Sequence, residues 1–198
     1  MATNPNTAPR HIQVHSSVQI SPHMQRIYFR SDKFADFPLD EAGAHIKLFF
    51  PEQRSALPLL PYRNALGKIV WPEGKRPVTR TYTIRDFIAD EQLLVVDFVR
   101  HADFGTAVNW AVHAQKGDVI GLAGPGGPAR FNPEADYFIF IGDLSALPMI
   151  AASLEQLRAD AQGEAWIEIE QASDQQPLSA PQGVQIHWIG ADQAFEDA

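Results

Sequence analysis

Residues 80–85, RTYTIR, carry side chains that could bind a large anionic cofactor. Alternation along a strand would place Arg80 and Tyr82 on one face and Thr83 and Arg85 on the other. A dinucleotide needs an aromatic surface for its ring, hydroxyl donors, and a cation for its phosphates. Arg80, Tyr82 and Thr83 could supply all three at one strand end. Taken alone, however, the segment fits an ordinary edge strand better, with a packed tyrosine and a solvated arginine.

Two other positions could approach phosphate or nucleotide groups. Gly105 precedes an expected helix over 106–114, where a glycine admits a ligand and the helix N-terminus presents free N–H groups. Gly142 and Asp143 end an expected strand and precede a helix, which is where α/β sheets bind nucleotides. Each signal is weak alone, because the first fits a plain helix cap and the second a plain βα turn.

The charge of the 198-residue chain is unevenly distributed. The formal net charge is −8, which argues against nucleic acid as the main partner. From Lys47 to Arg85, however, eight basic and two acidic residues give +6, leaving −14 elsewhere. Such a patch attracts phosphates or anionic small molecules, although a solvated basic face explains it equally well.

The composition restricts the possible chemistry. There is no cysteine, which excludes disulfides, thiol catalysis and cysteine-ligated iron–sulfur clusters on this chain. The seven histidines form no metal-binding pattern, so we expect no metal site, and electron transfer would need a bound cofactor. Residues 1–10 predict a polar, flexible tail rather than a secretory signal. Since no stretch approaches the roughly 20 apolar residues of a membrane span, we expect a cytoplasmic protein without membrane insertion.

The first two thirds of the chain predict six short strands, typical of a closed or nearly closed antiparallel β-barrel. The strands are expected at 11–20, 24–30, 45–50, 78–84, 93–100 and 118–122. A long loop rich in proline and glycine should separate the third strand from the fourth, and the helix over 106–114 should interrupt the barrel. We expect a barrel domain over 11–132.

The remaining residues, 133–198, predict a partial parallel α/β domain. The continuous apolar run at 137–141 is expected to be a strand buried on both faces. A helix over 146–159 and strands at 165–169 and 184–188 should follow. Strand, helix and strand with a tight first turn are the start of a parallel sheet.

The order of these segments resembles the siderophore-interacting protein family, a branch of the ferredoxin-reductase-like flavoproteins. The resemblance runs from about Val14 to about Glu170. It rests on RTYTIR (80–85), VDFVRH (96–101), GTA (105–107) before Trp110, KGD (116–118), GLAGPGG (121–127) and GDLSALP (142–148).

The resemblance implies an FAD-binding barrel followed by a nicotinamide-binding α/β domain. It implies roles for eleven residues with the flavin: Arg80, Tyr82, Thr83, Arg85, Asp97, Val99, His101, Gly105, Thr106, Ala107 and Ser145. The backbone of residues 105–107 would cradle the pyrophosphate, and Gly142 and Asp143 would approach the nicotinamide. Lys47 looks like the family's basic residue that faces an anionic ferric siderophore.

By resemblance, NADH or NADPH would give a hydride to FAD, which would pass electrons singly to Fe(III) and so release iron from its siderophore. No protein residue need act as acid, base or nucleophile. The donor could also be a ferredoxin. Glu168 and Glu170 lie at an expected strand end and favour NADH over NADPH, because an acid there can bind a ribose hydroxyl.

Three features depart from the family pattern. Leu144 and Ser145 replace the usual Glu and Thr, and Val108 stands where a serine is common. Family members also continue through further α/β elements, so we expect the nicotinamide domain here to be incomplete. Two other functions stay open: a general flavin or quinone reductase, and a flavin-binding module without turnover.

Overall fold

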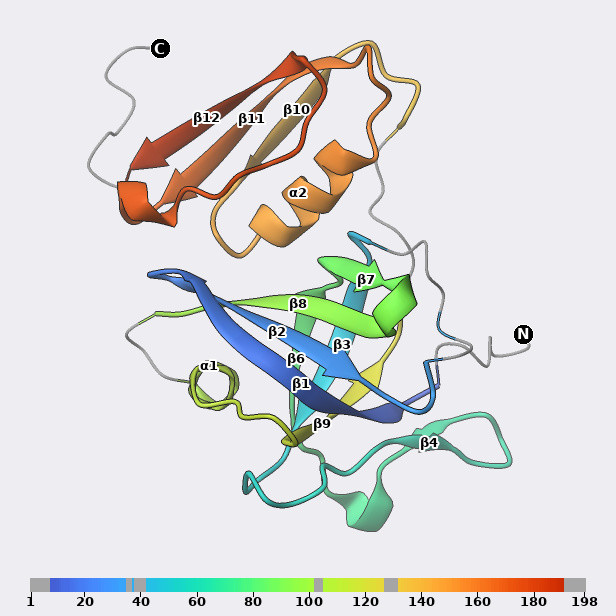
Figure 1. Ribbon diagram of the computed structural model, residues 1–198. Helices are drawn as coiled ribbons and strands as arrows, with labels where there is room; N and C mark the ends of the chain where they lie inside the picture. The colour runs from blue at the N-terminus through green and yellow to red at the C-terminus, as the bar shows by residue number, and fades with distance from the viewer. Residues whose placement is uncertain (1–7, 35–36, 38–41, 102–104, 127–131, 191–198) are drawn as a thin grey trace.

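The computed structural model describes residues 8–34, 37, 42–101, 105–126 and 132–190. They form two units, a curled antiparallel sheet and a smaller parallel sheet with one helix, which lie one above the other in Figure 1. No helix within these ranges is both long and apolar enough to cross a membrane.

The larger unit is a seven-stranded sheet with the strand order β6-β3-β9-β1-β2-β8-β7, and all its neighbouring pairs are antiparallel. Its strands are β1 (Arg10–Ser21), β2 (Met24–Arg30), β3 (His45–Phe50), β6 (Val78–Thr83), β7 (Asp86–Ile88), β8 (Leu93–Val99) and β9 (Val119–Ala123). Six of them are the expected strands within two residues at each end. The seventh, β7, escaped prediction because three residues are too short for a visible alternation.

The sheet curls around an aromatic core. Although β6 and β8 are not neighbours in the sheet, the ring of Tyr82 on β6 lies 4.4 Å from that of Phe98 on β8. Helix α1 (Thr106–Val112) adds Trp110, whose ring stacks 6.3 Å from Phe29. The helix is two residues shorter than expected, because His113 already leaves helical geometry.

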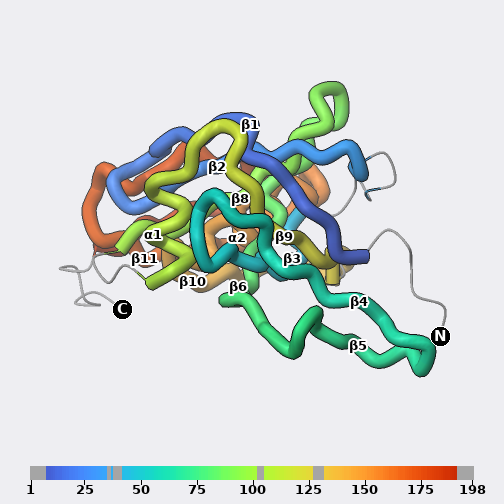
Figure 2. The backbone as a smooth tube through the Cα atoms, turned by 90° about the horizontal axis from the view of Figure 1, so that it is seen from below, coloured from blue at the N-terminus to red at the C-terminus, as the bar shows by residue number. Residues whose placement is uncertain are grey.

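The expected loop between β3 and β6 contains a small hairpin of β4 (Tyr62–Arg63) and β5 (Ile69–Val70), followed by the 3-10 turn η2 (Pro72–Gly74). The Asn64 side chain closes the hairpin by accepting hydrogen bonds from the backbone N–H groups of Leu66 and Lys68, both at 3.0 Å. The hairpin projects from the body of the molecule (Figure 2).

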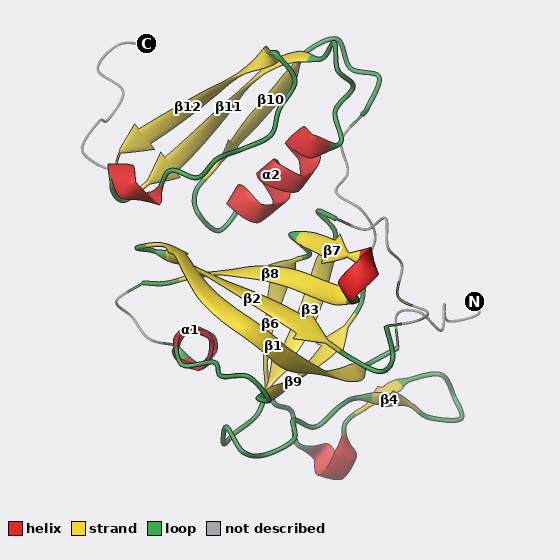
Figure 3. Cartoon of the chain, viewed as in Figure 1, coloured by secondary structure: helices red, strands yellow, loops and turns green. Residues whose placement is uncertain are grey.

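The smaller unit is a parallel sheet of β10 (Phe138–Gly142), β11 (Gln162–Ile169) and β12 (Gly183–Gly190), in that order. Helix α2 (Leu147–Glu155) packs on one face of it (Figure 3). Two further 3-10 turns lie within the described residues: η3 (Ala89–Glu91), between β7 and β8 of the larger unit, and η4 (Ala172–Asp174), after β11.

The expectation that the first strand of this unit is buried on both faces was wrong. On β10, Phe138 and Phe140 are buried towards the helix, but Ile139 is 63% and Ile141 76% exposed. Within the described residues a helix covers only one face of the sheet, so alternate side chains of the apolar run meet solvent. The expected domain boundary at 132–133 adjoins residues 127–131, which lie outside the described ranges.

Candidate functional site

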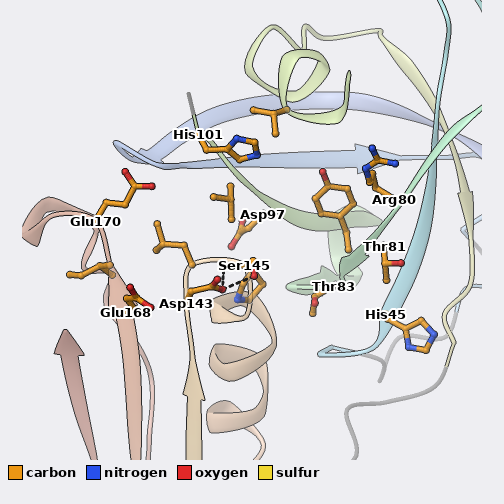
Figure 4. Close-up of a pocket in the computed structure, with 16 residues that line it drawn as sticks. His45, Arg80, Thr81, Thr83, Asp97, His101, Asp143, Ser145, Glu168 and Glu170 are labelled. Atoms are coloured by element: carbon orange, nitrogen blue, oxygen red, sulfur yellow. Dashed lines mark hydrogen bonds between the residues drawn. The ribbon is translucent and has the colours of Figure 1, made fainter. Parts of the chain in front are cut away.

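A cleft of about 560 Å³ lies between the two units. Sixteen residues line it (Figure 4): His45, Arg80, Thr81, Tyr82, Thr83, Asp97, Val99, His101, Val108, Asp143, Leu144, Ser145, Pro148, Glu168, Ile169 and Glu170. Eight of the fourteen residues expected from the sequence are among them. The six that are not are Lys47, Arg85, Gly105, Thr106, Ala107 and Gly142.

Strand β6 supplies the basic and hydroxyl-bearing part of the cleft. Arg80, Thr81, Tyr82 and Thr83 all line it, although successive side chains of a strand point to opposite faces. β6 is the terminal strand of its sheet among the described residues, so side chains of both faces can border the cleft. One strand end thus supplies a cation, hydroxyl groups and an aromatic ring.

The tyrosine is held firmly within this group. Its ring packs 4.4 Å from Phe98 and 6.4 Å from Phe50. Burial raises the pKa of Tyr82 to about 12, an effect that the charge of Arg80 partly offsets. Tyr82 therefore stays neutral near pH 7 and keeps its hydroxyl proton as a hydrogen-bond donor.

Strand β8 contributes the outward-facing Asp97 and Val99, and His101 follows the strand. Asp97 is only 5% exposed, and its two carboxylate oxygens accept hydrogen bonds from Arg26 at 2.7 and 2.8 Å. The bond to Asp97 raises the pKa of Arg26 above its ordinary value. The pair fixes the carboxylate at the cleft wall, and the exposed His101 also lines the cleft (Figure 4).

Residues 105–107 at the start of α1, which were expected to bind the pyrophosphate, are not among the residues that line the cleft. Gly105 is the N-cap residue, and a Cβ added there would meet nothing within 4 Å. Val108, one turn into the helix, is the residue of this helix that lines the cleft. Residues 102–104, which connect β8 to this helix, are outside the described ranges.

Lys47 and Arg85 are not among the residues that line the cleft, and both have protein partners. The ammonium group of Lys47 donates a hydrogen bond to the Thr81 hydroxyl, and thereby lies next to a residue of the cleft. Arg85 forms a bidentate ion pair with Glu155 on α2, at 2.9 and 2.6 Å. The first residue borders the cleft, and the second ties the two units together.

The opposite wall is the turn between β10 and α2. Asp143 accepts hydrogen bonds from the Ser145 N–H at 2.8 Å, the Ser145 hydroxyl at 2.5 Å and the Ala146 N–H at 3.2 Å. The hydroxyl bond is the main cause that lowers the pKa of Asp143. A Cβ on Gly142 would lie 2.5 Å from the Ala146 Cβ, so this close turn requires glycine. Leu144 is buried in the core of this unit.

A second contact between the two units is made by Asp174, which lies in the turn η4 after β11. Asp174 is fully buried and accepts hydrogen bonds from the Ser21 hydroxyl, the His23 N–H and His23 Nδ1, at 2.8, 2.9 and 2.7 Å. Burial acts to raise its pKa, but the bonds from His23 and Ser21 outweigh burial and lower it. His23 Nε2 also lies 3.1 Å from a carboxylate oxygen of Glu170. These bonds fix the end of β11 against the turn between β1 and β2.

Several residues of the site were missed from the sequence. His45 lines the cleft two positions before Lys47, on the same exposed face of β3, so strand alternation could have identified it. A Cβ on Gly126 would lie 2.0 Å from His45 Nε2, which shows how closely the chain after β9 approaches this ring. Nothing in the sequence around Asp174 marks its contact with His23. The described residues contain no group of three His, Asp or Glu side chains that could hold a metal ion.

Comparison with family models gives two adjacent matches. Residues 13–129 match the siderophore-interacting FAD-binding domain, and residues 135–198 match the siderophore-interacting protein model. The first match covers the curled sheet, and the second covers the α/β unit.

Individual relatives agree with these models. The chain is 38% identical over 184 residues to the ferric vibriobactin reductase of Vibrio cholerae, covering 93% of this chain and 67% of that protein. It is 33% identical over 184 residues to the NADPH-dependent ferric-chelate reductase of Escherichia coli, covering 91% and 70%. The crystal structure of a siderophore-interacting protein from Aeromonas hydrophila superposes with a TM-score of 0.78 at 35% identity, covering 94% and 69%. The chain thus spans about two thirds of the length of these relatives.

Proposed function

Because this chain belongs to the siderophore-interacting protein family, we propose that it is an FAD-dependent reductase that releases iron from ferric siderophores. The observation that carries the proposal is the cleft itself. One wall gathers an arginine, hydroxyl groups and a tyrosine ring, and the other is a βα turn of the kind that approaches nucleotides.

The residues of the first wall fit a flavin dinucleotide. The ring of Tyr82 is an aromatic surface, Thr81 and Thr83 carry hydroxyl groups, and Arg80 carries a charge that suits a phosphate. We propose as flavin-binding residues Arg80, Tyr82, Thr83, Arg85, Asp97, Val99, His101, Gly105, Thr106, Ala107 and Ser145. We also propose that the curled sheet is the flavin-binding barrel, over 11–132, with β7 as an added edge strand.

We assign the second wall, within 133–198, to the electron donor. Gly142 and Asp143 lie at the carboxyl end of β10, where a nicotinamide nucleotide would approach. NADH and NADPH are the proposed donors, and the Escherichia coli relative is named for NADPH. A ferredoxin is the alternative donor. Because reduced nicotinamide is a cytoplasmic reductant, we place the protein in the cytoplasm.

Bound FAD would supply the chemistry, by accepting a hydride from the nicotinamide and passing electrons one at a time to Fe(III). The chain's own residues bind and orient the reactants. Tyr82, neutral at pH 7, and Thr83 offer hydroxyl donors at the cleft wall, and the Arg26–Asp97 pair keeps a carboxylate acceptor in place. Lys47, beside Thr81, is the proposed contact for the anionic ferric siderophore.

Two other functions use the same cleft. A general flavin or quinone reductase would reduce many acceptors and would not depend on Lys47. A flavin-binding module without turnover would hold FAD but would not accept electrons from a nicotinamide. Neither is favoured by a specific contact in the structure, so both serve as outcomes of the tests.

The proposal is tested by purifying the protein, recording its visible spectrum and adding NADH or NADPH without oxygen. Flavin absorption that is bleached by either nucleotide, and restored by a ferric siderophore, is the expected result. Absorption that no nucleotide bleaches would support the flavin-binding module or a ferredoxin donor. A colourless protein that takes up no added FAD would refute the proposal.

A further inference from the structure

Residues 57–76 form an arm with an unusual number of exposed apolar side chains. Leu57 is 65% exposed, Tyr62 54%, Leu66 80% and Ile69 61%. They are four of the nine large hydrophobic residues that are exposed among those the structure describes. Leu66 sits in the loop between β4 and β5, at the tip of the hairpin, and is the most exposed of the nine. Leu57 lies at the base of the arm, whereas Tyr62, Leu66 and Ile69 belong to the projecting hairpin. Apolar side chains exposed together on such a hairpin are a sign of an interaction site.

The same arm is basic. It contains Arg63, Lys68, Lys75 and Arg76 against Glu73 alone, a net charge of +3 in a chain of −8. Arg63 and Lys68 flank the tip, and Arg63 donates a hydrogen bond to the Gly67 carbonyl at 2.8 Å. Both cations are exposed and lie within three residues of Leu66.

The α/β unit carries a charge of the opposite sign to that of the arm. Residues 134–198 contain twelve acidic residues and one arginine, a net charge of −11. Figure 1 places the α/β unit at the end of the molecule opposite the arm. A negatively charged surface would therefore attract the arm and repel the α/β unit, which sets one orientation of approach.

We propose that the arm docks the protein onto the surface of an anionic phospholipid bilayer. Leu66 enters the headgroup region, while Arg63 and Lys68 meet the lipid phosphates. Apolar residues with nearby cations are the combination that binds such interfaces, and each cation strengthens the attraction. Tyr62, with an apolar ring and a polar hydroxyl, suits the same depth.

The geometry of the hairpin favours lipid over a folded protein partner. Tyr62 pairs with Val70 and Arg63 with Ile69, so the two pairs point to opposite faces of the two-stranded ribbon. The exposed apolar residues Tyr62 and Ile69 therefore lie on different faces, and a rigid partner could contact only one. A fluid lipid interface can surround the tip on all sides.

Docking in this orientation leaves the cleft free, because the cleft lies between the two units, and the arm lies on the side of the curled sheet away from the α/β unit (Figure 1). The inference stands independently of the proposed function. A protein that holds no flavin would still dock, and a failure to dock would leave the reductase proposal intact.

The test is sedimentation of the full chain with vesicles of phosphatidylcholine alone, and of equal parts phosphatidylcholine and phosphatidylglycerol. We expect binding to the anionic vesicles only, weakened by added salt. Leu66→Ser should lower the partition coefficient about tenfold and Lys68→Ala about fivefold. The matched control is Ile141→Ser, which removes an equally exposed residue, 76% against 80%, from the opposite end of the molecule.

Three results would overturn the proposal. The first is no sedimentation with anionic vesicles, which would leave a protein partner as the explanation of the arm. The second is equal binding to both vesicle types, and the third is binding that Ile141→Ser weakens as much as Leu66→Ser does. Circular dichroism of each variant separates loss of docking from loss of folding.

Discussion

The two walls of the cleft differ in charge and in how their side chains are held. The wall formed by the curled sheet presents Arg80, Thr81 and Thr83 around a tyrosine that packs into an aromatic core. The α/β wall presents carboxylates, and Asp143 is bonded within its own turn. The first wall suits a large anionic group with an aromatic ring. The second is a fixed backbone turn that a nucleotide can approach. The difference fits our proposal that the first wall binds the flavin and the second receives the electron donor.

The strongest test of this contrast is Tyr82→Ala. Losing the aromatic surface should weaken FAD retention about a hundredfold, because burying an aromatic ring is worth roughly 2 to 3 kcal/mol. Fluorescence titration of the purified protein with FAD measures the effect. Tyr82→Phe should retain FAD within a few fold, and Tyr62→Ala on the arm should change nothing. Unaltered retention in Tyr82→Ala would mean that the flavin does not lie against the Tyr82 ring.

The second test removes a contact that positions the α/β wall. Asp174→Ala deletes the acceptor of three hydrogen bonds at a fully buried position and should cost about 2 kcal/mol of unfolding free energy. Urea unfolding measures it, with the exposed Asp136→Ala as the control. A loss no larger than that of the control would show that the walls are held together elsewhere.

The same contact predicts a dependence on pH. The pKa of Asp174 is lowered in the folded protein, so its contribution is complete above the unfolded value of about 3.9 and is lost as the pH falls through the folded value. Acidification below about pH 4 should therefore destabilise the native protein more than it destabilises Asp174→Ala.

The third test concerns Arg85, which joins the walls through Glu155. A double-mutant cycle of Arg85→Ala and Glu155→Ala should give a coupling of about 1 kcal/mol, since the pair is bidentate but Glu155 is partly exposed. If Arg85 also binds the flavin, as we propose, Arg85→Ala will weaken FAD retention even where Glu155 is already alanine. If Glu155→Ala and the double variant retain FAD equally, Arg85 contributes only to the contact between the units.

The smallest expected effect is that of Lys47→Ala. Removing one exposed cation beside the cleft should raise the KM for an anionic ferric siderophore about threefold to fivefold at low ionic strength. Steady-state kinetics measure the change, and Lys68→Ala on the arm is the matched control. A reductase that is equally fast with and without the Lys47 side chain would be a general one.

Local patterns in the sequence predicted most of the elements. Alternation predicted six strands of the curled sheet, and the apolar run with its glycine turn predicted β10 and α2. The apolar run at 137–141 did not show which face of β10 is buried, because that depends on which face the helix α2 packs against. β7 was too short for its period to be seen.

The site was predictable where its residues lie close together in the sequence. Arg80, Tyr82 and Thr83 lie on one strand, and the structure does bring them to the cleft. The contacts that bring the two walls together could not be foreseen. Asp174 meets His23 across 151 positions of sequence, and Arg85 meets Glu155 across 70. No local pattern of residue types encodes such pairs, so the sequence marked Arg85 only as an expected flavin contact and did not mark Asp174 at all.

These long separations also bear on how the protein matures. The curled sheet is incomplete until β9, ending at Ala123, has been synthesised and pairs with β1. The contacts of Asp174 with His23 close a loop across 151 positions and cannot form until the second unit has been synthesised. A nascent chain can therefore complete the curled sheet before the cleft exists. Because all the proposed flavin residues except Ser145 precede the end of β9, we expect FAD to begin binding at that stage and the donor side of the cleft to be completed last, when the α/β unit docks.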